Sequence, residues 1–248
     1  MKLPAEWLMP DWDAPPTVNS FITTRHGGVS KGVYSSMNLG TRVEDDPEAV
    51  RCNRSIVNRH LPATPLWLQQ VHGSRVVDSS EWQPGIEADA IVTRDCDRVC
   101  VIMMADCLPV LFCSNTSTVV AAAHAGWRGL AAGVLENTIV AMQAPPASMN
   151  AYLGPAIGAS VFEVGDDVYE RFCRQDETAR ASFVVHGPGK WLCDLYALAR
   201  ARLQRAGVAR VWGGEYCTYS DTTRFFSHRR DRVSGRMAAF IWRSEAVT

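Results

Sequence analysis

Short apolar runs ended by Gly, Pro or a charged residue make up most of the hydrophobic pattern of the chain. Runs of this kind, rich in Val, Ile and Ala, predict β-strands. We expect strands within residues 19–24, 66–77, 88–94, 99–113, 117–126, 150–154, 208–218 and 235–242. Residues 99–113 are apolar at nearly every position, which predicts one strand buried on both of its faces.

Three segments carry helix signals instead. Asp46 suits the N-cap of a helix that starts at Pro47, because proline is well tolerated at the first helical position. A second helix is expected over 127–142, where apolar side chains recur on one face. Asp194 is the expected N-cap of a third helix, and Gly207 follows its end.

The order of these elements predicts the fold class. Strands and helices are interspersed without a regular βαβ period, and the sequence shows no internal repeat and no low-complexity linker. A chain of 248 residues is long enough to bury a sizeable core without a disulfide or metal. We therefore predict an α/β (α+β) protein in which residues 1–248 form a single catalytic domain of mixed sheets and helices.

Charge and composition exclude several classes of partner. The formal net charge is −1, from 25 basic and 26 acidic residues, so neither nucleic acid nor an anionic membrane is an expected partner. The first residues lack the long apolar segment of a signal peptide, and the longest apolar run contains Asp106 and Pro109. We expect a cytoplasmic protein whose eight cysteines are mostly reduced thiols.

Cys107, His124 and His72 are candidates for one chemical site. Each stands where an apolar strand meets small or turn-forming residues, and Asp106 beside Cys107 needs a partner such as a metal or an arginine. Two imidazoles and a thiolate suit zinc with a fourth position left open. From the residues alone, two other interpretations stay open. The cysteine is a core residue, or Cys107 is a nucleophile and His124 is its base.

Eight motifs in order along the chain narrow these alternatives. They are TTRHGGVS, NLG, LQQVHG, ADAIVT, ADCLPVLF, AAHAGWRG, LGPAIG and FFSHRRD followed by SGR. Together they resemble the bacterial purine nucleoside phosphorylase family, whose members are also labelled polyphenol oxidase, laccase-domain protein or peptidoglycan editing factor. The resemblance implies a zinc site on His72, Cys107 and His124. It also implies a four-layer sandwich fold related to cysteine-hydrolase-like domains.

The resemblance further implies a reaction and its small-molecule partners, a nucleoside and phosphate. Phosphate would attack C1′ of adenosine, inosine or methylthioadenosine and release the base. Arg25, beside Gly27 and Gly28, and Arg229, in the C-terminal basic motif, are the expected phosphate-binding residues. Adenosine deamination is also expected. The usual zinc-deaminase signature is missing, so Asp106 or Asp89 would have to shuttle protons.

Two further enzymatic hypotheses remain. The first is a cysteine-dependent amidase that edits peptidoglycan precursors, with Cys107 as nucleophile. The second is a copper-dependent polyphenol oxidase, with copper in place of zinc. We reject the copper oxidase as the main function because the chain has only six histidines, too few for a multicopper centre. A binding module without catalysis is the remaining alternative, and the oligomeric state is left open.

Overall fold

The computed structural model describes residues 3–116, 118–208 and 210–245. Residues 117 and 209, which belong to two of the expected strands, lie outside the described residues, as do 1–2 and 246–248 of the expected domain. Within the described part, no helix combines the length and the apolarity needed to cross a membrane. The predicted α/β class is confirmed.

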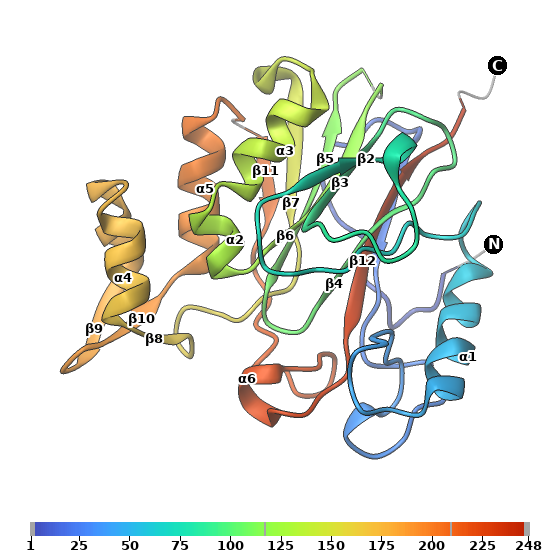
Figure 1. Cartoon of the computed structure of the whole chain (residues 1–248), viewed down its shortest axis with the longest axis horizontal. Coiled ribbons are helices and arrows are strands. Elements are labelled where there is room, and N and C mark those ends of the chain that lie inside the picture. The colour runs from blue at the N-terminus through green and yellow to red at the C-terminus, as the bar shows by residue number, and fades with distance from the viewer. Residues whose placement is uncertain (1–2, 117, 209, 246–248) are drawn as a thin grey trace.

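A six-stranded sheet runs through the centre of the molecule (Figure 1). Its strands, in spatial order, are β11 (Arg210–Gly213), β7 (Met149–Leu153), β5 (Leu108–Ser114), β6 (Val120–Ala125), β3 (Ala90–Thr93) and β2 (Val76–Asp78). The two outer pairs are parallel, and the inner pairs are antiparallel. Alternate residues of these strands therefore face two different cores.

Helices cover one face of this sheet and a second sheet covers the other. The helices are α2 (Trp127–Ala131), α3 (Val134–Met142) and α5 (Leu195–Arg205), which share one core with the six-stranded sheet. The second sheet has the order β1 (Val18–Ile22), β12 (Met237–Arg243) and β4 (Cys100–Met104), all antiparallel. Its inner face packs against the six-stranded sheet through residues such as Ile102 and Ala239.

Helix α1 (Pro47–Asn58) covers the outer face of the second sheet (Figure 1). Val57 of this helix shares a buried cluster with Phe21 of β1 and Phe240 of β12. The order helix, sheet, sheet, helices gives the four layers that the resemblance implied. Three successive apolar interfaces explain why this chain can bury so many complete strands.

The remaining elements were not predicted. A small antiparallel sheet of β8 (Glu163–Gly165), β10 (Lys190–Cys193) and β9 (Phe183–Gly187) stands with α4 (Asp166–Cys173) at one end of the molecule (Figure 1). Helix α6 spans His228–Asp231, and short 3₁₀ helices occupy Gly32–Tyr34, Ser79–Glu81, Pro146–Ser148 and Glu177–Ser182. Strand β9 is largely exposed, so its sequence lacks the apolar alternation of a buried strand.

Capping predicted two helix starts correctly. The Asp46 side chain accepts a hydrogen bond from the Glu48 N–H, and that of Asp194 accepts one from the Ala197 N–H. The single helix expected over 127–142 is wrong. Gly133, with a φ of +90°, separates α2 from α3, and this left-handed conformation interrupts a helix.

The single strand expected over 99–113 is also wrong. Strands β4 and β5 belong to different sheets, and a turn at 105–107 joins them. Asp106 has a φ of +87° there, and its carboxylate accepts hydrogen bonds from Thr218 Oγ1 and the Arg229 N–H, each at 2.6 Å. The strand expected over 66–77 is reduced to isolated bridges at Leu66 and Gln69 followed by β2.

Candidate metal centre

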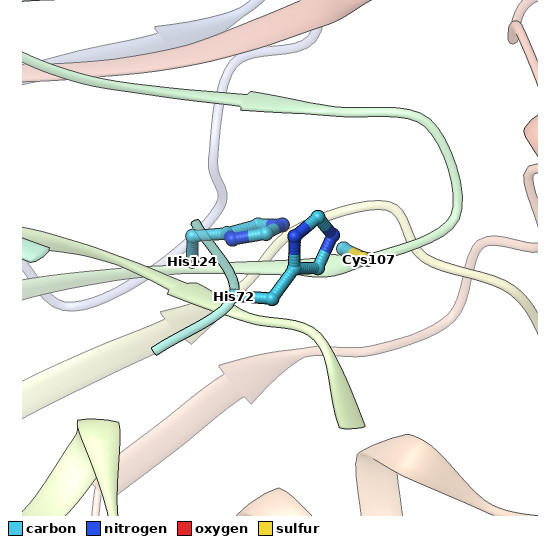
Figure 2. A group of neighbouring side chains, drawn as sticks. All are labelled: His72, Cys107 and His124. Atoms are coloured by element: carbon cyan, nitrogen blue, oxygen red, sulfur yellow. The ribbon is translucent and has the colours of Figure 1, made fainter. Parts of the chain in front are cut away.

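Three elements bring the candidate ligands together at one end of the six-stranded sheet. His124 is the buried penultimate residue of β6, and Cys107 directly precedes β5. His72 belongs to the loop before β2 and has a φ of 61°. The ligand atoms of these three residues all lie within 4.8 Å of one another (Figure 2). The structure therefore brings together the three side chains that the sequence singled out.

Asp89 holds two of these residues in place. Its fully buried carboxylate accepts hydrogen bonds from His124 Nδ1 at 2.8 Å and from the main-chain N–H groups of Val71, His72 and Gly73 at 3.2, 2.9 and 2.7 Å. Because a carboxylate only accepts, Nδ1 of His124 carries the proton and Nε2 is left for a ligand. Sequence reasoning named Asp89 only as a proton shuttle and missed this positioning contact.

The charges at the site favour a thiolate. Burial raises the pKa of the Cys107 thiol, but His124 and His72 outweigh that effect and lower it to about 6. Burial lowers the pKa of His124, whereas the Cys107 thiolate and Asp89 outweigh burial and raise it to about 9. These shifts favour a Cys107 thiolate and a protonated His124 ring in the metal-free protein, so a metal that binds Nε2 must displace its proton. The thiolate form is also the one that binds metals.

Gly126 leaves the space that the Cys107 thiol occupies. A Cβ at this position would lie 2.7 Å from Cys107 Sγ and 3.4 Å from His72 Cδ2. We expect Gly126→Ala to displace Cys107 and weaken zinc binding by about ten- to a hundredfold, the range found when groups around a metal site are disturbed. Competition with a chelating dye would measure this loss.

Gly165→Ala is the matched control for that variant. Gly165 has a φ of −89°, and its added Cβ would meet only the movable end of the exposed Asp167 side chain. The control should bind zinc as the wild type does. Equal affinity in both variants would show that Cys107 can move without loss of the metal.

A cavity of about 660 Å³ opens beside the three candidate ligands. We call it the metal-centre cavity. Trp67 and Trp82 contribute aromatic surface to its wall, and Arg54 and Arg236 contribute guanidinium groups. His72, Cys107 and His124 line the same space, so a molecule bound in the cavity would meet the candidate ligands directly. Its volume suits a ligand the size of a nucleoside.

The other residues predicted for the site do not line this cavity. Arg25 donates hydrogen bonds to the carbonyls of Ser35 and Thr222, and Arg229 donates to the carbonyl of Glu163. Neither arginine lines the metal-centre cavity, and neither does Asp106, whose oxygens are both occupied in the turn before Cys107. Sequence reasoning missed Arg54 and Arg236, which do line it.

Comparison with known proteins decides the family. The family model described as "Multi-copper polyphenol oxidoreductase laccase" matches residues 19–244. The chain belongs to this family. Curated relatives of this chain are named purine nucleoside phosphorylase, which is the family that the eight sequence motifs resemble. The resemblance is therefore confirmed.

Several family members are similar over nearly their whole length. Purine nucleoside phosphorylase from Pseudomonas aeruginosa is 48% identical over 95% of this chain and 98% of its own. A purine nucleoside phosphorylase from Streptomyces coelicolor is 38% identical over 89% of this chain and 93% of its own. Among solved structures, a Neisseria meningitidis protein superposes with a TM-score of 0.94 at 53% identity, over 97% of this chain and 100% of its own. YlmD from Geobacillus stearothermophilus has a TM-score of 0.84 at 31% identity, over 93% of each chain.

Proposed function

We propose that this protein is a zinc-dependent purine nucleoside phosphorylase acting on adenosine, inosine and methylthioadenosine. The observation that carries the proposal is the convergence of two imidazoles and one thiol within 4.8 Å on the wall of a nucleoside-sized cavity. Two nitrogen ligands and a thiolate fit zinc with an open position. The names of the curated relatives support phosphorolysis as the reaction.

The residues of the chain divide the work of this reaction. A phosphate oxygen bonds to C1′ of the ribose while the bond from C1′ to the base breaks. The base leaves with that electron pair and takes up the proton that hydrogen phosphate loses. Zinc, when bound by His72, Cys107 and His124, supplies a Lewis acid at the cavity wall. Asp89 orients His124 and the His72 loop. The indole of Trp82 offers a flat apolar surface that suits a purine ring.

Asp106 has a positioning role in this proposal. Its carboxylate fixes the turn that presents Cys107, and both oxygens accept hydrogen bonds from groups outside the metal-centre cavity. Asp89 contacts His124 directly, so it is the better placed of the two carboxylates to influence a proton at the site. Adenosine deamination stays a prediction, and release of ammonia from adenosine would measure it.

A cysteine-dependent amidase is the second candidate because of one specific arrangement. Cys107 has the lowered pKa of a nucleophilic thiol, and His124 beside it can serve as the base. Asp89 orients His124 through the 2.8 Å contact between its Oδ1 and His124 Nδ1. Such a thiolate could attack an amide of a peptidoglycan precursor. A metal bound to Cys107 would block this attack, so the two functions require opposite metal states.

One experiment separates the two functions. We expect purified protein to contain about one zinc per chain, as the three ligands predict, and to release base from inosine only when phosphate is present. Chelation should abolish this activity, and zinc should restore it better than copper. Phosphate-independent hydrolysis of an amide substrate that survives chelation and stops on thiol alkylation would instead establish the amidase.

A further inference from the structure

Arg54 and Arg236 are half-buried arginines on the wall of the metal-centre cavity, and neither pairs with a carboxylate of the described residues. No salt bridge among the described residues includes either of them. Charged side chains removed from water are normally paired, because burial of an isolated charge is costly. Burial lowers the pKa of Arg54 to about 10. Burial also lowers the pKa of Arg236 below its ordinary value. Two such groups on one cavity wall favour an anionic ligand.

Arg54, on α1, is held in place by two of its three guanidinium nitrogens, and the third has no partner among the described residues. Nε and Nη2 donate hydrogen bonds to the Leu39 carbonyl at 3.0 and 2.9 Å. The guanidinium carbon lies 3.8 Å from the centre of the Trp67 ring, which supports one face of the group. Nη1 has no hydrogen-bond partner among the described residues, so it can donate to a molecule in the cavity.

Arg236, just before β12, also uses only part of its guanidinium group for contacts within the protein. Its Nη1 donates to the carbonyls of Ser234 and Gly235 at 2.8 and 3.1 Å and to the Ser234 hydroxyl at 3.2 Å. Nε and Nη2 make no hydrogen bond to a described residue. The charges of Cys107 and Asp106 favour the protonated form of Arg236, and no salt bridge joins Arg236 to a carboxylate among the described residues. Its donors therefore remain available on the side that the Nη1 contacts do not use.

The NLG motif, residues 38–40, is hydrogen-bonded to both Arg54 and Arg236. The carbonyl of Leu39 binds Arg54, and the Leu39 N–H donates to the Arg236 carbonyl at 2.9 Å. Asn38 Oδ1 accepts from the N–H groups of Gly40 and Arg236 at 2.9 and 2.8 Å. A Cβ at Gly40 would lie 2.8 Å from Arg236 Cγ, so glycine there leaves room for the arginine stem. One short segment, residues 38–40, thus positions both arginines.

We propose that Arg54 and Arg236 form the phosphate-binding site of the metal-centre cavity, a role that rests on the proposed phosphorolysis. A guanidinium offers parallel N–H donors that match the oxygens of a phosphate. Both side chains line the cavity that the candidate zinc ligands also line, which places the anion beside the reacting centre. The assignment replaces Arg25 and Arg229, whose guanidinium groups donate to main-chain carbonyls outside this cavity.

Calorimetric titration with inorganic phosphate tests the site directly. We expect Arg54→Met and Arg236→Met each to weaken phosphate binding by about ten- to a hundredfold, the usual effect of losing one charge-assisted contact. The KM for phosphate should rise by a similar factor, while the KM for inosine changes little. Arg54→Lys should recover only part of the binding, because lysine keeps the charge without the fork of donors.

Arg59→Met is the matched control, since Arg59 is an exposed arginine that caps the same helix α1. It should bind phosphate as the wild type does, and circular dichroism and zinc content should confirm that all variants fold. Wild-type phosphate binding in both Met variants, or no phosphate binding by the wild type, would overturn the proposal. Binding that depends on Arg54 and Arg236 without any base release would keep this site and refute phosphorolysis.

Discussion

Cys107→Ala is expected to abolish zinc binding and base release together while the fold survives. The side chain supplies one of the three candidate ligands found among the described residues, and its thiolate is the negatively charged one. Truncation of one small side chain beside a turn should reduce the free energy of unfolding by only about 1–3 kcal/mol. Metal analysis, phosphate-dependent turnover of inosine and urea unfolding measure the three effects.

Cys217→Ala is the matched control for this variant. Cys217 is also a half-buried free cysteine, but its sulfur accepts hydrogen bonds from Ser220 and Gly158 outside the metal-centre cavity. Zinc content and turnover should remain those of the wild type. Full turnover in Cys107→Ala would exclude both the zinc enzyme and the cysteine amidase, since each requires this sulfur.

Asp89→Asn should weaken both the metal site and the fold. The carboxylate receives three main-chain N–H groups and the His124 ring, and an amide that presents its own N–H groups cannot accept all of these hydrogen bonds. We expect zinc affinity to fall by about ten- to a hundredfold. The free energy of unfolding should fall by about 3–5 kcal/mol, as for other broken buried pairs. Dye competition and urea unfolding provide the two measurements.

Asp78→Asn provides the comparison for Asp89. Asp78 pairs with Arg94 at 2.9 Å, and its side chain is 37% exposed. Exposed pairs of this kind contribute about 0–1 kcal/mol, so this variant should be nearly as stable as the wild type and should bind zinc normally. If Asp89→Asn behaved in the same way, the His72 loop would have to be held by contacts other than the carboxylate.

Local signals predicted the parts of the fold that depend on neighbouring residues. The caps at Asp46 and Asp194 bind N–H groups two and three residues away, so sequence alone shows both partners. The turn at Asp106 depends on Thr218 and on Arg229, which lie 112 and 123 positions further along the chain. The residues around 99–113 do not include these partners, so the local sequence predicts one strand where the structure has β4 and β5.

Some residues of the candidate site could likewise be predicted from the sequence, whereas others depend on the fold. His72, Cys107 and His124 stand at strand ends or turns and belong to motifs that resemble a family, so the sequence alone predicts them. Arg54 could not be distinguished from a surface arginine, because its unpaired state follows from the packing of α1 against Leu39 and Trp67. Arg25 and Arg229 were chosen for their motifs, but the fold directs their donors to main-chain carbonyls.

The position of β12 between β1 and β4 sets an order of assembly during translation. The middle strand of this sheet follows both of its neighbours in the sequence, so β1 and β4 have only isolated bridges, to Leu8 and Leu66, until residues 237–243 leave the ribosome. His72, Cys107 and His124 are all synthesised well before that point, whereas Arg236 emerges with β12. A nascent chain can therefore gather the metal-binding side chains early, but the proposed anion site is complete only after Arg236 and β12 have been made.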